Sequence, residues 1–152
     1  MEPDTEQLKI EVRRSDDFAA ARELAREAQL EVSADAREPL ALWGAYDGER
    51  LIGVVTLAAE GDLPIVEWVA VRDGYRRRGV AGRLLAALEE EARRRGHGPL
   101  WATARAPAFF AAAGYEIVDS GEVRERLLAD CRDCPQRGLT CRPEVVRKTL
   151  GR

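Results

Sequence analysis

The chain has 152 residues, of which 45% are hydrophobic and 34% are charged, and its formal net charge is −3 at pH 7. This composition predicts one globular domain with a sizeable core, and the acidic balance argues against nucleic-acid binding driven by overall charge. No run of about 18 apolar residues is present, so no membrane span is expected. The N-terminus shows no basic region followed by an apolar run, which predicts no signal peptide and a cytoplasmic location.

The first predicted elements are a strand and a helix. Residues 8–13 alternate apolar and charged side chains, as in a half-buried strand. From residue 16 to about residue 30, apolar side chains recur at the spacing of an amphipathic helix. Ser15 directly precedes this segment, and serine is a favoured N-cap residue, so we expect the helix to begin there.

Three strands are predicted next. Residues 40–46 and 51–58 are apolar segments separated by Asp47-Gly48, a dipeptide typical of tight hairpin turns. A further strand is expected over 63–71, after a second turn. Three strands in succession with short connections predict an antiparallel meander.

The clearest predicted helix spans residues 80–95. One face is apolar, whereas Glu89, Glu90 and Glu91 belong to the face predicted to meet water. Gly96 is expected to end the helix. The rest of the chain predicts short elements, namely strands over 100–103, 115–118 and 145–150 and a helix over 107–113 closed by Gly114.

A basic loop joins the strand at 63–71 to the helix at 80–95. It reads Arg76-Arg77-Arg78-Gly79-Val80-Ala81. The first turn of a helix offers free backbone N–H groups and the positive end of a dipole, which together form an anion site. Gly79 and Ala81 would let phosphate oxygens approach the backbone, and Arg76 could add a charged contact. Taken alone, the loop fits a solvated, charged helix start equally well.

Two segments together resemble the GNAT superfamily of N-acetyltransferases. Arg76-x-x-Gly79-x-Ala81 after a strand is similar to the signature Arg/Gln-x-x-Gly-x-Gly/Ala. The segment 106–115 is similar to the second signature, Ala-x-x-Phe-Tyr-x-x-x-Gly-Phe. The resemblance implies an α/β acyl-CoA N-acyltransferase fold, in which a mixed, mostly antiparallel sheet is flanked by helices. It covers residues 8–119 of a single domain, 1–152, and leaves 120–152 as a variable, cysteine-bearing C-terminal segment.

The resemblance also implies acetyl-CoA as cosubstrate. The backbone of Val69 to Val71 would pair with the pantetheine arm, the N–H groups of Arg77 to Ala81 would hold the pyrophosphate, and the segment around Thr103 to Phe110 would line the opposite side. The cofactor-binding residues so implied are Val69, Ala70, Val71, Arg76, Arg77, Arg78, Gly79, Val80, Ala81, Thr103 and Phe110.

Acetyl transfer to an amine needs a base for the amine and a proton for the leaving thiolate. Glu67, on the strand just before Val69, is the candidate general base, although it also fits a surface charge on a strand. The family's usual acid tyrosine corresponds to Phe110, which cannot donate a proton. Tyr75, Tyr115, a thiol from the tail or water would have to substitute. A second interpretation is therefore a non-catalytic acyl-CoA-binding or sensing domain.

Three cysteines, Cys131, Cys134 and Cys141, lie in the C-terminal segment. A Cys-x-x-Cys pair can bind zinc with a third thiolate, which would make the segment a metal-dependent interaction module. No histidine lies nearby to complete the site. Thiol–disulfide exchange between the first two cysteines, or three free thiols, fit the same spacing.

The tail resembles one branch of the superfamily, the short N-acetylglutamate-synthase-like enzymes. Cys134-Pro135 and the terminal Lys148-x-Leu150 carry this similarity. It implies that the acceptor is a small-molecule amine, such as the α-amine of an amino acid, bound near residues 24–42 and the tail. A homodimer is a further expectation, whereas partners of nucleic acid or membrane are not expected. The three tryptophans are expected in the core.

Overall fold

The structure is a computed structural model that describes residues 10–28, 39–104, 106–128 and 144–150. No helix in these ranges is long and apolar enough to cross a membrane. The elements are β1 (Ile10–Arg14), α2 (Phe18–Glu27), β2 (Ala41–Asp47), β3 (Arg50–Glu60), β4 (Leu63–Val71), α3 (Val80–Arg94), β5 (Pro99–Ala104), α4 (Pro107–Ala112), β6 (Glu116–Val118), α5 (Glu122–Leu128) and β7 (Glu144–Thr149).

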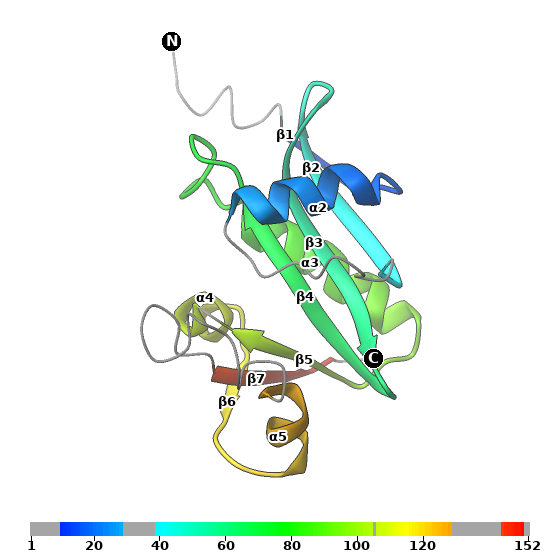
Figure 1. The fold of residues 1–152 in the computed structure, drawn as a ribbon, viewed down its shortest axis with the longest axis vertical. Helices are drawn as coiled ribbons and strands as arrows, with labels where there is room; N and C mark the ends of the chain where they lie inside the picture. Colours follow the sequence, from blue (N-terminus) through cyan, green and yellow to red (C-terminus); the bar gives the residue numbers. More distant parts are fainter. Residues whose placement is uncertain (1–9, 29–38, 105, 129–143, 151–152) are drawn as a thin grey trace.

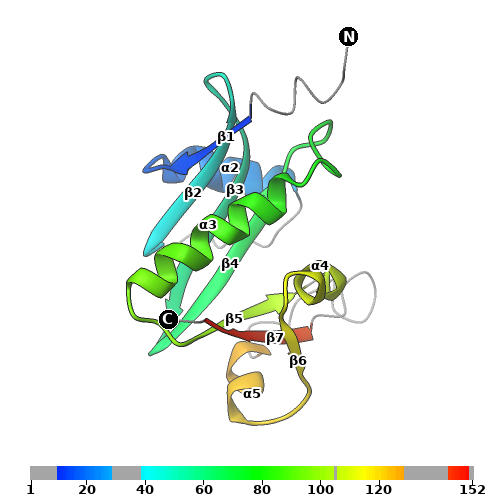
Figure 2. The same cartoon turned by 180° about the vertical axis from the view of Figure 1, so that it is seen from behind.

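The strands form one sheet in the order β1-β2-β3-β4-β5-β7-β6. Only the β4–β5 contact is parallel, and the other five described contacts are antiparallel. Figure 1 shows α2 lying across one face of the meander, and Figure 2 shows α3 crossing the opposite face. The predicted fold, a mixed and mostly antiparallel sheet flanked by helices, is confirmed.

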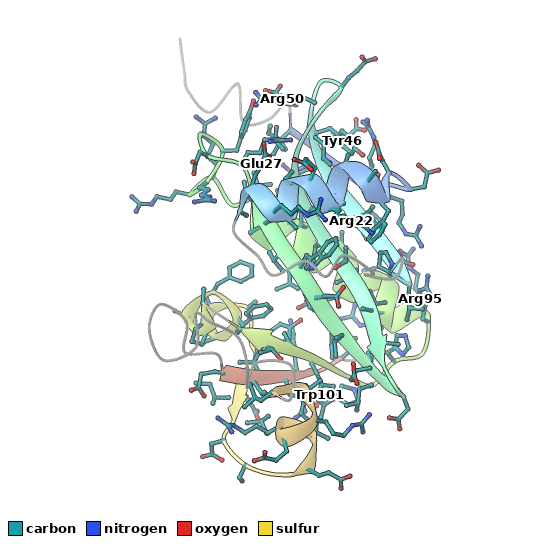
Figure 3. The ribbon with its side chains drawn as sticks, viewed as in Figure 1. Arg22, Glu27, Tyr46, Arg50, Arg95 and Trp101 are labelled. Atoms are coloured by element: carbon teal, nitrogen blue, oxygen red, sulfur yellow. The ribbon has the colours of Figure 1, made fainter. Side chains whose placement is uncertain are left out.

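Each face of the sheet has its own core. Leu84, Leu85 and Leu88 of α3 are buried against one face, and Leu24 of α2 is buried against the other. A third cluster lies between β5 and α5, where Trp101 packs against the end of that helix (Figure 3). Of the three tryptophans expected in the core, those at 68 and 101 are buried and the one at 43 is half-buried.

The start of α2 differs from the prediction. The N-cap is Asp17, whose carboxylate accepts a hydrogen bond from the N–H of Ala20 at 3.0 Å. The Ser15 hydroxyl instead accepts bonds from the Asp17 N–H and from the Tyr46 hydroxyl of β2. The Ser15 hydroxyl therefore stabilises the turn before the helix. Its partner Tyr46 lies on β2, far along the chain, so the local sequence does not reveal this role.

The prediction that the glutamates of α3 face water was wrong for Glu89 and Glu91. Glu89 is only 7% exposed and accepts hydrogen bonds from the Tyr115 hydroxyl (2.8 Å) and the Lys148 ammonium (3.0 Å). Glu91 is half-buried and accepts bonds from Arg14 and Trp43 as well as from its helix neighbour Arg95. Periodicity alone missed both burials, because most of the partners come from distant parts of the chain.

The C-terminal part contains two features beyond the predictions. Glu122 to Leu128 form α5 in a segment that showed only a polar tail. The strand expected over 145–150 is present as β7, and it inserts between β5 and β6 and pairs antiparallel with both. This insertion completes the half of the sheet beyond β4.

Candidate functional site

The two central strands separate partway along their length. β4 and β5 are paired at Ile65 with Trp101 and at Val66 with Ala102, and no further pair joins these two described strands. Figure 1 shows β5 leaving β4 at a wide angle beyond this point. The backbone of β4 from Val69 to Val71 is therefore not covered by β5.

A groove of about 630 Å³ lies along this opening. It is built from the end of β4, the loop before α3 with the first turn of α3, the end of β5, and α4. Nine of the predicted cofactor-binding residues line it together: Val69, Val71, Arg76, Arg77, Gly79, Val80, Ala81, Thr103 and Phe110.

Three of the predicted site residues that the structure describes do not line this groove. Ala70 is buried under α2, because successive strand residues point to opposite faces of a sheet. Arg78 is exposed, with its guanidinium 5.9 Å from the centre of the Tyr75 ring. Glu67 is exposed on β4, ahead of the groove-lining part of the strand.

Other residues that line the groove were not named individually from the sequence. Phe109 belongs to the segment from Thr103 to Phe110 that was expected to line the opposite side of the cofactor. Tyr75 lies directly before the arginines and was considered only as an acid. Ala28 comes from the end of α2, and no local pattern connects it with the loop 50 residues later in the chain.

The loop before α3 presents its backbone to the groove. Gly79 is the N-cap in the left-handed region (φ 76°), and Arg77 is there too (φ 65°), a conformation rare for residues with a side chain. Alternating backbone conformations of this kind turn successive N–H groups toward one side. Unlike α2, whose Asp17 caps its first turn, α3 has no side-chain capping bond among the described residues. Its first N–H groups are thus available to an anion.

Hydrogen bonds from the loop to its surroundings fix its shape. The Nε of Arg76 donates to the carbonyl of Val71 at 2.9 Å, and its guanidinium pairs with Asp73 at 3.1 Å. The Tyr75 hydroxyl donates to Asp47 at the β2–β3 turn. This bond raises the pKa of Tyr75, so its hydroxyl is a weaker acid than a free tyrosine.

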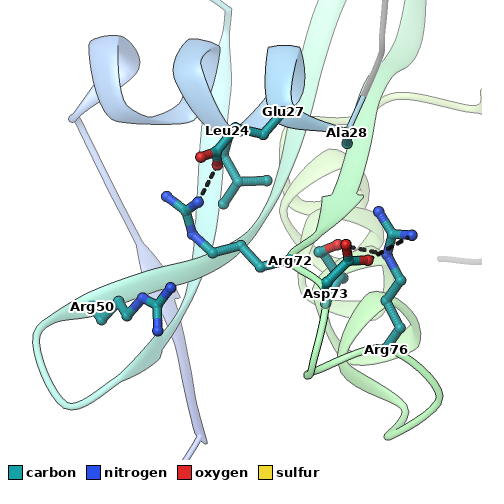
Figure 4. A pocket seen from close by; sticks show the side chains of 8 residues that line it. Leu24, Glu27, Ala28, Arg50, Arg72, Asp73 and Arg76 are labelled. Carbon is teal, nitrogen blue, oxygen red and sulfur yellow. Dashed lines mark hydrogen bonds and ion pairs between the residues drawn. The ribbon is translucent and has the colours of Figure 1, made fainter.

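A smaller charged hollow of about 230 Å³ adjoins the groove (Figure 4). Its charged groups are the Arg72–Glu27 ion pair, the Arg76–Asp73 pair and Arg50. It lies against the end of α2 and shares three lining residues with the groove, namely Ala28, Val71 and Arg76. Three cations facing two carboxylates suit a polar ligand group better than an apolar one.

The aromatic residues beside α4 show which hydroxyls can reach the groove. Phe110 is 7% exposed and meets Phe109 and Tyr115 edge to face, with ring centres 5.2 and 5.1 Å apart. Tyr115 lies behind Phe110 and donates its hydroxyl to Glu89. Burial, together with this carboxylate, raises the pKa of Tyr115. Of the two tyrosines considered as acids, only Tyr75 lines the groove.

The predicted metal ligands Cys131, Cys134 and Cys141 lie outside the described residues. Within the described ranges, no group of three or more histidine, cysteine or acidic residues could hold a metal ion. Zinc binding by the cysteines therefore stays a prediction.

Comparisons with known proteins agree with this geometry. A family model described as the acetyltransferase (GNAT) family matches residues 8–115. No curated protein matches the chain significantly.

Among solved structures, N-acetylglutamate synthase from Neisseria gonorrhoeae, complexed with coenzyme A and N-acetyl-glutamate, is similar with a TM-score of 0.71 and 21% identity. That match covers 94% of this chain but 35% of the other, so the chain spans about a third of the Neisseria enzyme. Rv2747 from Mycobacterium tuberculosis, in complex with CoA and NLQ, has a TM-score of 0.70 at 18% identity, over 93% and 99% of the two chains. The ribosomal-protein-S18-alanine N-acetyltransferase from Escherichia coli has a TM-score of 0.69 at 14% identity, over 94% and 95%.

These likenesses establish the fold, and the family model covers well over half of the sequence. The residues that build the groove, and the start of α3 that lacks a side-chain cap, lie within the range that the family model matches. The chain therefore belongs to the acetyltransferase (GNAT) family of acetyl-CoA-dependent N-acetyltransferases.

Proposed function

We propose that this protein transfers the acetyl group of acetyl-CoA to the primary amine of a small polar molecule, with an amino acid as the preferred acceptor. The observation that carries the proposal is the groove itself. It joins an anion-binding helix start to an exposed strand backbone and ends where the two central strands separate.

The cofactor lies along the groove in this proposal. The N–H groups of residues 77–81 bind the pyrophosphate at the start of α3, where the helix dipole favours negative charge. The pantetheine arm, which carries amide groups, pairs with the backbone of Val69 to Val71 in place of β5. Thr103 and Phe110 close the opposite side. The thioester then reaches the point where β4 and β5 separate.

The reaction is a direct transfer. The neutral amine attacks the thioester carbonyl, a C–N bond forms, and the C–S bond breaks to release the CoA thiolate. Glu67 accepts the proton that the amine loses, through a water molecule, because its carboxylate lies on β4 just before the groove. The thiolate takes its proton from water, since Phe110 has no hydroxyl and the hydroxyls of Tyr115 and Tyr75 are bound to Glu89 and Asp47.

The charged hollow beside the groove supports a polar acceptor. It is built partly by the end of α2, within the segment 24–42 where acceptor contacts were expected. Arg50 and Arg72 can attract a carboxylate there, and Glu27 and Asp73 can attract a cation. The Neisseria neighbour holds an N-acetylated amino acid, which agrees with this class of acceptor.

The test follows free CoA released from acetyl-CoA in the presence of matched acceptors. Each amino acid is paired with the amine that lacks its α-carboxylate, such as glutamate with 4-aminobutyrate and alanine with ethylamine. We expect the amino acids to react at least about tenfold faster, because a charged acceptor group contributes about 1.5–3 kcal/mol through its hydrogen bonds. Equal rates within each pair would refute amino-acid recognition. No CoA release with any amine would refute the activity.

A variant of Glu67 tests whether this residue is the base. Glu67→Gln keeps the size of the side chain but cannot accept the proton, so we expect kcat to fall by about 10²-fold or more. Binding of CoA, measured by calorimetry, should stay within about twofold, because the carboxylate lies outside the groove that holds the cofactor. A variant with unchanged kcat would show that Glu67 is a surface charge only.

The three cysteines allow a separate proposal, a zinc site formed by Cys131, Cys134 and Cys141. Its support is the Cys-x-x-Cys spacing with a third thiolate seven residues further on. Elemental analysis of the purified protein tests it directly. One zinc per chain that is lost in a triple Cys→Ser variant is expected, whereas a metal-free protein would reject the site.

A further inference from the structure

A β-bulge interrupts the sheet beside the groove. One residue of β3, Thr56, faces two residues of β4, Glu67 and Trp68, because the pairing between these strands shifts there by one residue. A bulge bends its strand and leaves one backbone group without its usual ladder partner. The bulge lies directly after Val66, the last residue of β4 that pairs with β5, and directly before Val69, the first that lines the groove.

Thr56 supplies a hydrogen-bond acceptor for a backbone N–H group at the bulge. Its side chain is fully buried, and its hydroxyl oxygen accepts a hydrogen bond from the backbone N–H of Trp68 at 3.0 Å. Among the described residues, it is one of only two buried polar or charged residues, the other being Glu89. An isosteric valine would fill the same space but would leave the buried N–H without an acceptor, which is costly inside a protein.

The side chain of Trp68 also fixes the bulge, through its contact with α2. The Trp68 ring is 4% exposed and stacks on Phe18 of α2, with ring centres 5.6 Å apart and ring planes within 5°. Trp68 is thus fixed by its backbone to β3 and by its ring to α2. Sliding β4 past β3 by one residue would reverse which side chains face the groove, because alternate residues point to opposite faces.

We propose that Thr56 is a positioning residue for acetyl-CoA binding. Its hydroxyl holds the bulge at Glu67 and Trp68 in the register that presents Val69 to Val71 to the pantetheine arm. The inference rests on the proposed function, because it assumes that the cofactor lies along this part of β4. It assigns a role in binding to a residue that does not line the groove.

The experiment compares substitutions that keep or remove the hydroxyl. Thr56→Ser and Thr56→Ala both lose the methyl group, so their difference isolates the hydroxyl, and Thr56→Val replaces the hydroxyl with a methyl group. Two ligands are titrated by calorimetry. CoA contacts the whole groove, whereas its fragment 3′-phospho-ADP lacks the pantetheine arm and reports on the loop before α3 alone.

We expect the valine and alanine variants to bind CoA about tenfold more weakly, as loss of one buried hydrogen bond implies, whereas serine stays within about threefold of the wild type. Binding of 3′-phospho-ADP should remain within about twofold in all three, because the bonds that hold the loop are elsewhere. Ile52→Ala is the control for general instability, since it removes a fully buried side chain of the same strand. It should unfold more easily while retaining CoA affinity.

Three results would overturn the assignment of Thr56. They are wild-type CoA affinity in the valine and alanine variants, an equal loss in the serine variant, and weakening of both ligands to the same extent. Failure of the wild-type protein to bind CoA would instead refute the proposed function. If Thr56→Val does not fold, the serine and alanine pair decides the question.

Discussion

At the residue scale, the loop before α3 shows how much a short motif can predict. Residues 76–81 could be proposed as an anion site from their own sequence, because small residues, positive charge and a helix start need no distant partners, and all of them except Arg78 line the groove. Ala28 could not be identified in this way, since it reaches the groove from the far end of α2. Glu89 and Glu91 were assigned to solvent for the same reason, because their partners come from other elements.

Gly79 provides a test of the anion site. Alanine would be strained at its φ of 76° and would place a methyl group where the proposed function places a phosphate oxygen. We expect Gly79→Ala to weaken CoA binding by about tenfold or more, as measured by calorimetry. Gly96→Ala is the matched control, because Gly96 has a similar φ of 84° and an equally open surrounding at the other end of α3. Equal losses in both variants would attribute the effect to helix strain alone.

Phe110 allows a gain-of-function test. If water protonates the thiolate, a hydroxyl at this position should accelerate the reaction, because Phe110 lines the groove. We expect Phe110→Tyr to raise kcat by about threefold to tenfold, well below the usual gain from a general acid, because the ring is packed between two aromatic neighbours. Steady-state kinetics with the best acceptor measures the effect. An unchanged or lower kcat would mean that thiolate protonation does not limit the reaction.

At the element scale, one carboxylate of α3 forms hydrogen bonds with both of the first two strands. Glu91 accepts hydrogen bonds from Arg14 of β1 at 2.6 Å and from Trp43 of β2 at 2.7 Å. These contacts, the Arg14 bond above all, lower the pKa of Glu91 from 4.5 to about 2. The meander and α3 were predicted with ends correct to within two residues, because both have strong periodicity. α5 was missed, since it is short and its apolar residues are few.

The lowered pKa of Glu91 makes a prediction about pH. A carboxyl group whose pKa is lower in the folded state stabilises the fold above its unfolded pKa, and this contribution is lost as the pH falls from 4.5 toward 2. We expect Glu91→Gln to lower the free energy of unfolding by about 1–2 kcal/mol at pH 7. This difference from the wild type should become smaller as the pH falls into the acid range. Denaturant titrations at several pH values measure this. Glu90→Gln, at an exposed neighbour, should differ much less from the wild type in its free energy of unfolding. A difference for Glu91→Gln that does not change with pH would contradict the prediction.

At the scale of the whole molecule, few residue pairs connect the two halves of the sheet that meet at the groove. β1 to β4 form one half and β5 to β7 form the other, with two paired positions between them among the described residues. Behind the groove, Lys148 of β7 joins Glu89 of α3 to the carbonyl of Ala113 at the end of α4. The sequence predicted the strands but not their order across this opening, because the position of β7 depends on contacts between distant segments.

The lysine bridge gives a prediction about stability. Lys148→Met keeps most of the apolar stem but leaves the buried Glu89 with the Tyr115 hydroxyl as its remaining hydrogen-bond partner among the described residues. We expect the free energy of unfolding to fall by about 2–3 kcal/mol, since a buried carboxylate loses its cation. Thermal and denaturant unfolding provide the measurement. Arg147→Met, at the half-exposed neighbour on the same strand, should cost less than about 1 kcal/mol, and similar losses in both would exclude a special role for the bridge.

The central place of β7 in its half of the sheet has a consequence for biosynthesis. β2, β3 and β4 can pair in turn as they leave the ribosome, because each pairs with the strand made just before it. Apart from the two pairs that β5 makes with β4, β5 and β6 must wait for residues 144–149, which come after them in translation and separate them in space. The half of the sheet that carries Thr103 is thus completed last, after the loop before α3 has been synthesised. Until then, β5 and β6 expose strand edges that are open to pairing with other chains, so a nascent chain stalled before residue 144 is the species most exposed to aggregation.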